Sequence, residues 1–374
     1  MLQLHAGRVL EDRRFLFCIT LAAALLAFLG PLFAYDLWWH LKAGGLILSS
    51  GAVPRTDPFS FTAAGQPWTY HSWLSGLALT GVWRAGGTTG LIGLRAVLIA
   101  GSLMVGWVAA RKRGVGAGLA SVLVLAACLQ LKLRALARPY LFSFVLFIAF
   151  ALILQSCAAS PLERALEQAR ECRRRFKRLA AESCFLWGAG GRLILLPLLT
   201  VLWANLHAGF ISGMLLIGAF GVGEMVSLWV RRGGRPYGSA LLREPDGARF
   251  RAMFLAGVLC LPASLLTPYG PGTLLYPFRL LEGVKLVKQV QEWQPMPFGM
   301  AFAVFWGLLA LGGIILVRSV YFSRKAGRLG DEIGPVVTDL LLMCGFAFLA
   351  VQAVRHMAWF LLLVPSVFGW HLAV

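Results

Sequence analysis

Long runs of apolar residues, separated by short polar and basic segments, dominate the pattern of this chain. The runs are continuous rather than alternating, which argues against barrel strands, and most are roughly 17–22 residues long. A helix of that length can cross about 30 Å of hydrocarbon. The pattern predicts an all-α, polytopic bundle of about ten transmembrane helices, at residues 15–35, 91–110, 115–131, 140–158, 193–206, 211–230, 252–266, 300–317, 336–354 and 358–372.

The first apolar run, 15–35, indicates a retained transmembrane helix. It follows three arginines, and no small-residue cleavage site precedes Asp36, as a removed signal peptide would require. No later segment has the length and polarity of a linker between two domains. We therefore expect one integral membrane domain that covers residues 1–374.

The positions of lysine and arginine predict the orientation of the bundle. If the N-terminus is cytoplasmic, most of the 35 lysines and arginines fall in inner segments, as the positive-inside rule expects. This bias places both termini in the cytoplasm. The outer face then carries two long segments, 36–90 and 267–298, whereas 159–192 is a basic cytoplasmic loop. Glutamates and arginines at helical spacing in that loop indicate a surface helix that contacts anionic lipid.

The amino-acid composition agrees with a membrane protein and argues against several other classes of protein. Hydrophobic residues make up 59% of the chain and charged residues 14%, whereas a soluble domain has about a quarter charged. The net charge of +19 is distributed in blocks between apolar runs, which argues against a nucleic-acid-binding stripe. The seven cysteines show no metal-binding spacing. Motifs of serine hydrolases, P-loop enzymes and zinc metalloproteases are absent as well.

Titratable residues are scarce on the predicted outer face, and they fall in a few places. Four of the 16 carboxylates and four of the six histidines lie there or at its rim. Any chemistry that the protein performs is therefore expected at this face. The residues are Asp36, Asp57, Glu282, Glu292, His40, His71, His207 and His356.

Asp36 and His40 are the first candidates for catalysis. Asp36 stands where the first run ends, and a carboxylate at that depth is costly without a partner or a function. If 36–50 is an interfacial helix, Asp36 and His40 share one face and could hold a cation. The alternative is that Asp36 only caps this helix.

The rest of the outer face adds an aromatic platform and several cations. The loop around Asp57 contains prolines and aromatic residues, and an amphipathic stretch follows it, which indicates a second interfacial helix. Asp57 precedes a proline and is either a site residue or a turn former. Arg138, Arg279 and Arg355 favour an anionic partner such as a phosphate, with snorkelling toward lipid headgroups as the alternative.

Six short sequence motifs, spread in order from Asp36 to Trp293, point to a more specific class of membrane protein. They are Asp36-Leu37-Trp38-Trp39-His40-Leu41, Pro54-Arg55-Thr56-Asp57-Pro58-Phe59-Ser60, Pro67-Trp68 with His71-Ser72-Trp73-Leu74, Trp203-Ala204-Asn205-Leu206-His207-Ala208-Gly209-Phe210, Pro268-Tyr269-Gly270 and Glu292-Trp293-Gln294. Together they resemble a bacterial branch of the GT-C superfamily, the glycosyltransferases that use polyprenyl-phosphate-linked sugars.

This resemblance implies a fold, an activity and a location. The expected fold is a GT-C bundle, and the expected reaction is an inverting transfer of sugar from a polyprenyl phosphate at the outer face of the bacterial inner membrane. Asp36 matches the acid that acts as general base, and a divalent cation, Mg²⁺ or Mn²⁺, is a possible cofactor. The implied catalytic residues are Asp36, Asp57 and His40, the implied substrate-binding residues are His71, Arg138, His207, Arg279, Glu292 and Arg355, and the candidate metal ligands are Asp36, Asp57 and Glu292.

Two positions depart from the pattern and keep other functions open. Ser72 and Gly76 stand where this branch commonly has acidic residues. A non-catalytic scaffold that binds other membrane subunits is therefore an alternative to the enzyme. A transporter or lipid scramblase is the third hypothesis, although it would favour charges near the midplane. The expected partners are membrane lipid and a lipid-linked sugar, and no nucleic acid.

Overall fold

The computed structural model describes residues 13–33, 36–158, 191–234, 247–282, 290–325 and 329–373. Within these ranges the regular structure is helical, apart from one isolated bridge between Thr56 and Pro67. This confirms the all-α class. The predicted basic loop 159–192 lies outside the described residues except for its last two positions.

Each of the ten predicted apolar runs contains a helix. Short 3₁₀ turns lie between several of them, including η5 (Gln291–Trp293) and η7 (Val354–His356). The α-helices are α2 (Arg13–Ala27), α3 (Leu37–Ser50), α4 (Trp73–Lys112), α5 (Ala117–Leu131), α6 (Tyr140–Ala158), α9 (Leu195–Leu206), α10 (Phe210–Arg231), α11 (Ala248–Ser264), α12 (Pro271–Glu282), α14 (Ala303–Lys325), α15 (Leu329–Gln352) and α16 (Met357–Ala373).

Six helical segments of the described chain are long and apolar enough to cross a membrane. The remaining predicted spans coincide with helices of 12 to 17 residues, namely α2, α9, α11 and α16. The structure thus indicates a multi-pass helical membrane bundle, and a count of about ten crossings stays a prediction. The six segments are Trp73–Lys112, Ala117–Arg134, Tyr140–Ala158, Phe210–Arg231, Met300–Lys325 and Glu332–Gln352.

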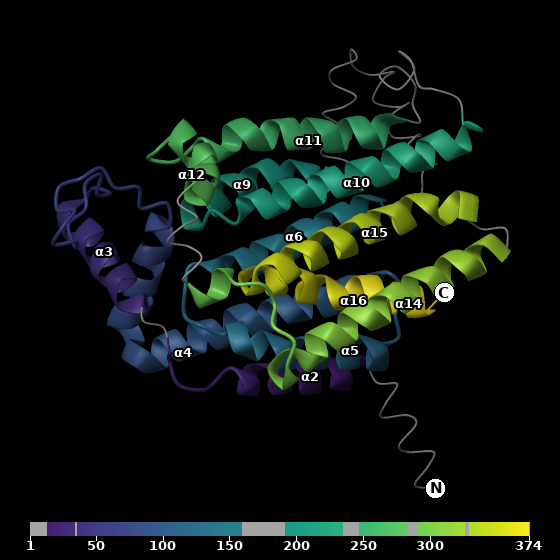
Figure 1. Ribbon diagram of the computed structural model, residues 1–374, viewed down its shortest axis with the longest axis horizontal. Coiled ribbons are helices and arrows are strands. Elements are labelled where there is room, and N and C mark those ends of the chain that lie inside the picture. Colours follow the sequence, from purple (N-terminus) through teal and green to yellow (C-terminus); the bar gives the residue numbers. More distant parts are fainter. Residues whose placement is uncertain are drawn as a thin grey trace, which may run out of the picture.

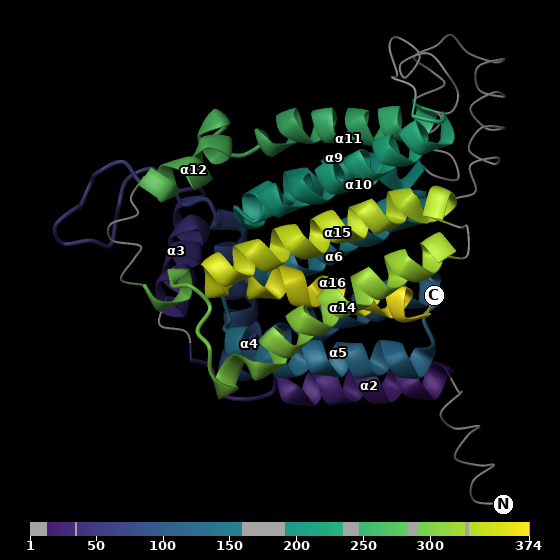
Figure 2. The same ribbon diagram turned by 45° about the vertical axis from the view of Figure 1, so that its right-hand side comes forward.

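The long helices lie side by side, and the additional elements gather at one end of the bundle. Figure 1 and Figure 2 both show α3, α12 and the loop after α3 at the left-hand end. The beginning of α2 and the end of α16 lie at the opposite end. We refer to the end with α3 and α12 as the loop end. The bundle therefore has one end with added structure and a plainer end that carries the described chain termini.

The centre of the bundle is α16, which is almost entirely apolar. Its residues Phe360, Leu361 and Val364 are fully buried, and the helix packs against α4, α5, α6, α14 and α15. Helices at the periphery expose large apolar side chains instead, such as Leu26 on α2 and Ile314 on α14. This distribution suits a surrounding of lipid, where apolar side chains need no burial in protein.

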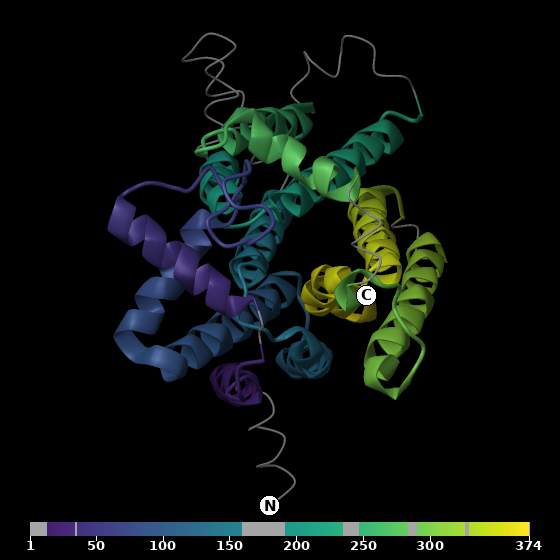
Figure 3. The ribbon, with the colours of Figure 1, turned by 60° about the vertical axis from the view of Figure 1, so that its left-hand side comes forward.

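Helix α4 consists of two arms that meet at Gly87. This residue has φ +53° and ψ −142°, a conformation that is open essentially to glycine alone. The arm 73–86 lies at the loop end and packs against α3, and the arm 88–112 is the second predicted span (Figure 3). Helices are therefore present where interfacial helices were predicted, as α3 and as the first arm of α4, and their location at the membrane interface stays a prediction.

Candidate functional site

Six of the predicted site residues come from six separate parts of the chain, and contacts or electrostatic interactions connect them. Asp36 precedes α3, and His71 ends the loop between α3 and α4. Arg138 lies just before α6, and His207 ends α9. Glu292 belongs to η5, and Arg355 belongs to η7.

Arg138 joins the two carboxylates that the sequence singled out. Its Nε donates to Oδ1 of Asp36 at 2.7 Å, and its Nη1 donates to Oε2 of Glu292 at 2.7 Å. Two more arginines approach Glu292: Arg134 donates to Oε2 at 3.2 Å, and Arg355 lies 4.0 Å from Oε1. These five residues, named here the ionic cluster, connect segments that are more than 150 positions apart in the chain.

The ionic cluster carries three guanidinium groups for two carboxylates. Burial raises the pKa of Glu292, but Arg134, Arg355 and Arg138 outweigh burial and hold that pKa below its ordinary value. Burial lowers the pKa of Arg355, whose guanidinium also lies 3.9 Å from the centre of the Trp293 ring. The excess of cations in a half-buried position suits an additional anion, such as a phosphate.

A group of histidines lies next to the ionic cluster. His40 Nδ1 is 3.0 Å from the Tyr70 hydroxyl, and His71 stacks on Tyr276 with ring centres 4.2 Å apart. The rings of His71 and His207 have centres 6.1 Å apart. We call His40, His71 and His207 the histidine group. His71 and His207 thus share one set of ring contacts, and His40 belongs to a second set with Tyr70.

The histidine group is neutral near pH 7. Burial, followed by repulsion from His71 and Arg138, lowers the pKa of His40 to about 3. Burial, followed by repulsion from Arg355, lowers the pKa of His71 to about 4. The pKa of His207 lies well below its ordinary value for the same reasons. Neutral imidazoles can donate or accept a proton without adding charge to a cationic site.

Hydrogen bonds define the tautomer of His207. Its Nδ1 accepts from the backbone N–H of Gly209 at 3.0 Å and lies 2.9 Å from the Ser143 hydroxyl. Ser143 accepts from the indole N–H of Trp203 at 2.8 Å and can donate its own proton to the imidazole. Since Nδ1 is an acceptor, the proton of the neutral ring is on Nε2. His207 therefore presents a donor on its other side.

Asp57 is placed differently from Asp36 and Glu292. Its Oδ1 accepts from the backbone N–H groups of Phe59 and Ser60 at 2.8 and 3.0 Å, and its Oδ2 accepts from the Ser60 hydroxyl. These bonds, first that of the hydroxyl, lower the pKa of Asp57. The carboxylate thus stabilises its own loop, as the turn-former interpretation expects.

The predicted metal set is not assembled in the described part of the chain. No group of three or more histidine, cysteine, aspartate or glutamate side chains stands close enough there to hold a metal ion. Asp36 and Glu292 both bind Arg138, and Asp57 binds within its loop. The geometry therefore fits an arginine-based anion site better than a carboxylate-based cation site. Arg279 belongs to α12, and its side chain lies outside the described part.

One of the two positions that depart from the resemblance has a structural reason to be glycine. Gly76 lies in the first arm of α4 against Tyr70, and a Cβ atom at Gly76 would collide with the Tyr70 hydroxyl. A Cβ atom at Gly44 of α3 would collide with the backbone of Gly76, so α3 and α4 approach closely here, and Tyr70 lies beside His40. Ser72 is buried at the start of α4.

Several residues of the site were not among the sequence-derived candidates. Arg134 precedes Arg138 by four positions, and two arginines in a polar gap between two apolar runs were an available signal. Tyr70 and Tyr276 contact the histidine group, and Ser143 orients His207. Ser143 lies within an apolar run, where nothing in the sequence distinguishes it from other small polar residues.

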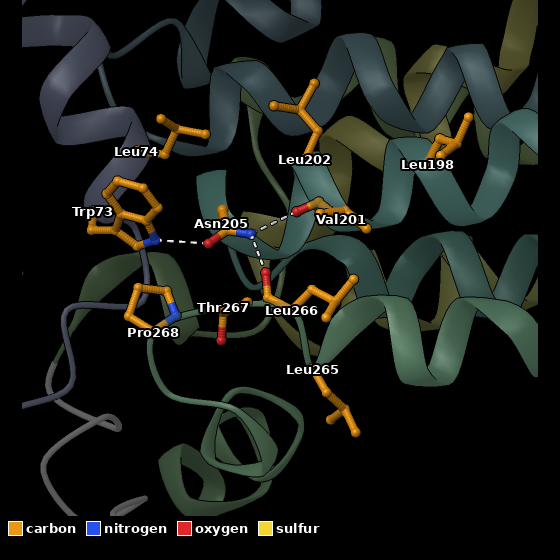
Figure 4. Close-up of a pocket in the computed structure, with 10 residues that line it drawn as sticks. All are labelled: Trp73, Leu74, Leu198, Val201, Leu202, Asn205, Leu265, Leu266, Thr267 and Pro268. Carbon is orange, nitrogen blue, oxygen red and sulfur yellow. Dashed lines mark hydrogen bonds between the residues drawn. The ribbon is translucent and has the colours of Figure 1, made fainter.

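An apolar groove opens beside the histidine group, between α9, α11 and the start of α4 (Figure 4). It has a volume of about 680 Å³. At its end Asn205 accepts from the Trp73 indole at 2.8 Å and donates to the carbonyl of Leu266 at 2.9 Å. Half of its ten lining residues are leucines, including the exposed Leu198 and Leu202. Trp73 and Asn205 are each two positions from a member of the histidine group, whereas no residue of that group or of the ionic cluster lines the groove.

In comparisons with known proteins, no family matches the chain and no curated protein matches it. A function for this protein is therefore inferred from the geometry of the site and from the resemblance of its sequence motifs.

Proposed function

We propose that this protein is a GT-C-like glycosyltransferase that transfers a sugar from a polyprenyl phosphate to an acceptor at the loop end of the bundle. The observation that carries the proposal is the ionic cluster, together with an apolar groove at the same end of the bundle, because a lipid-linked sugar phosphate has both an anionic group and a long apolar chain.

The arginines of the ionic cluster suit the phosphate of such a donor. Arg134, Arg138 and Arg355 approach Glu292, and Arg138 also binds Asp36, so the three cations meet two carboxylates and one further negative charge would balance the cluster. In the reaction the bond between the anomeric carbon and the phosphate oxygen breaks, and the phosphate leaves with the electron pair. Fixed cations stabilise the charge that develops on that oxygen. The position of the Arg138 guanidinium is fixed before the donor binds, because it is bonded to both Glu292 and Asp36.

The apolar groove suits the polyprenyl chain. Leu198 and Leu202 of α9 and Leu266, in the turn after α11, are exposed along it, so a chain in the bilayer could enter it from the side. The groove ends at Trp73 and Asn205, close in sequence to His71 and His207. A chain in the groove would bring its phosphate toward the histidine group, where Nε2 of His207 is a donor.

Asp36 suits the general base. Only its Oδ1 is occupied by Arg138, and within the described residues no hydrogen bond reaches Oδ2. Oδ2 can take the proton of an acceptor hydroxyl while the hydroxyl oxygen forms its bond to the anomeric carbon, with inversion. No step of this proposal requires a metal ion, since the arginines provide the positive charge.

The test is the substitution Asp36→Asn, assayed with a panel of polyprenyl-phosphate sugars and membranes that contain the full-length protein. Asparagine keeps the size of the side chain and caps a helix about as well as aspartate, but it cannot take the proton. We expect turnover to fall by at least about a hundredfold with normal expression and extraction. The matched control is Lys42→Gln, an exposed position further along α3, which should keep its activity.

The opposite results have clear meanings. Full activity of Asp36→Asn would remove Asp36 from the mechanism and leave it as a structural partner of Arg138, since its side chain makes no capping hydrogen bond to α3. Absence of transfer by the wild type with every donor would favour the scaffold hypothesis, in which the loop end binds another membrane subunit.

A further inference from the structure

A second charged pocket lies at the end of the bundle opposite the proposed site. It is formed by the beginning of α2 and the end of α4, and its volume is about 570 Å³. No carboxylate stands among the described residues that line it, and half of them are cations. The lining residues are Arg13, Arg14, Phe17, Cys18, Trp107, Val108, Arg111 and Lys112.

The pocket has two layers, which follow from the antiparallel course of the two helices (Figure 2). On α2 the cations Arg13 and Arg14 precede Phe17 by one turn, and on α4 Arg111 follows Trp107 by one turn. The charges of both helices therefore lie at one level near the end of the bundle. The apolar side chains lie about 5 Å deeper along the helices.

The deeper layer is held in a defined position. The rings of Phe17 and Trp107 pack edge to face with centres 5.3 Å apart. The Trp107 indole donates to the Ser121 hydroxyl at 3.1 Å, and Thr20 of α2 donates to the same hydroxyl at 2.8 Å. These bonds join α2, α4 and α5 below the pocket. The pocket is therefore a feature of the packed bundle and not a chance gap between flexible side chains.

The upper layer is also partly ordered. The guanidinium of Arg111 donates to the backbone carbonyl of Val115 and lies 5.9 Å from the centre of the Trp107 ring. Lys112 and Arg13 are exposed at the mouth. Four cations around one opening create a strong attraction for a phosphate group, and arginine can bind its oxygens in pairs.

We propose that this pocket binds one anionic phospholipid of the surrounding membrane. The headgroup phosphate contacts the cations of the upper layer, and the first part of an acyl chain lies on Phe17, Cys18 and Val108. A basic pocket between helices, at the depth of the headgroups, with an apolar layer directly below, matches the two parts of such a lipid in the same order. A free phosphate would use only the upper layer. The site is independent of the proposed transferase activity.

The test is native mass spectrometry of the full-length protein in detergent, titrated with phosphatidylglycerol, with phosphatidylcholine of the same acyl chains, and with inorganic phosphate. We expect the wild type to bind phosphatidylglycerol in preference to phosphatidylcholine. In the double variant Arg13→Gln with Lys112→Gln, binding of phosphatidylglycerol should weaken by about tenfold or more, since each cation near the surface contributes to the attraction.

Two further double variants distinguish lipid binding in the pocket from general electrostatic attraction of lipid to the protein surface. Arg324→Gln with Lys325→Gln removes the same two charges from the exposed end of α14, outside the pocket, and should leave binding unchanged. Arg13→Lys with Lys112→Arg keeps the charge and should keep the binding. Equal weakening in the pocket variant and in the α14 variant would overturn the proposal. Competition by inorganic phosphate at the concentration of the lipid would overturn it as well and indicate a simple anion site.

Discussion

Arg138 shows how much a single residue contributes to the candidate site. Its planar guanidinium bonds Asp36 through Nε and Glu292 through Nη1, so the spacing of the two carboxylates depends on one side chain. The sequence predicted all three residues at the same face, because each lies in a polar gap between apolar runs. It could not predict that they touch, since 102 and 154 positions separate Arg138 from its partners.

The buried histidines predict a dependence of stability on pH. His40, His71 and His356 have pKa values lowered to about 3, 4 and 4, mainly by burial. Because these histidines are neutral in the folded protein but take protons near pH 6.5 when unfolded, their contribution is complete above pH 6.5 and is lost as the pH falls. We expect the unfolding temperature to drop steadily between pH 6.5 and 4.5, in intrinsic fluorescence scans of the solubilised protein.

A variant connects this effect to a particular histidine. His71→Phe keeps the stacking on Tyr276 but removes one titrating group. Between pH 6.5 and 4.5, the free energy of unfolding of this variant should fall less steeply than that of the wild type. The difference in slope is up to about 1.4 kcal/mol per pH unit. The carboxylates contribute little there, since the pKa of Glu292 is held below its ordinary value of 4.5. An unchanged pH profile in His71→Phe would show that folding does not lower the pKa of this histidine.

Helix positions were predictable from the sequence to a greater extent than helix lengths. The interfacial helix 36–50 was predicted on polarity alone and is observed as α3, Leu37–Ser50. The second span was predicted at 91–110, whereas α4 continues without a coil from the outer segment to Lys112. The sequence favours a break between them because glycines and threonines interrupt the apolar pattern. The chain instead turns at one residue, Gly87, and resumes the helix at once.

The conformation of Gly87 leads to a prediction that distinguishes the effect of backbone strain on stability from the effect of helix propensity. Gly87→Ala places a Cβ atom in a conformation with φ +53° and ψ −142°, which costs about 1–3 kcal/mol. The neighbour Gly86 is helical, and a Cβ atom there meets no other group. We therefore expect Gly87→Ala to lower the unfolding temperature and Gly86→Ala to leave it equal or raise it slightly. Equal effects of the two variants would show that the corner at Gly87 does not persist in the membrane.

Charged pairs in the rest of the molecule show contacts that could not be predicted from the sequence. Arg113 of the predicted inner segment bonds Asp339 on α15 at 2.6 Å, and Arg249 lies 3.6 Å from the buried Glu224 on α10. Arg113 and Arg249 were visible as charges next to apolar runs, and Glu224 and Asp339 as charges within them. Their partners depend on which helices pack together, for example α10 with α11. Packing of apolar helices in lipid leaves few signals in a single sequence, because their surfaces are similar in composition.

The orientation of the whole molecule in the membrane is the last prediction. The loop end should face away from the cytoplasm, because most lysines and arginines lie in segments of the other end. Phe61 is fully exposed in the loop after α3, and Lys325 is exposed at the end of α14. In a cysteine-free background, Phe61→Cys should react with an impermeant maleimide in intact cells, and Lys325→Cys should react only after the membrane is opened. Ser72, in the same loop, is buried and would label poorly from either side. Labelling of Lys325→Cys alone in intact cells would reverse the orientation and place the ionic cluster in the cytoplasm, where a glycosyl transfer would have to use donors on that side.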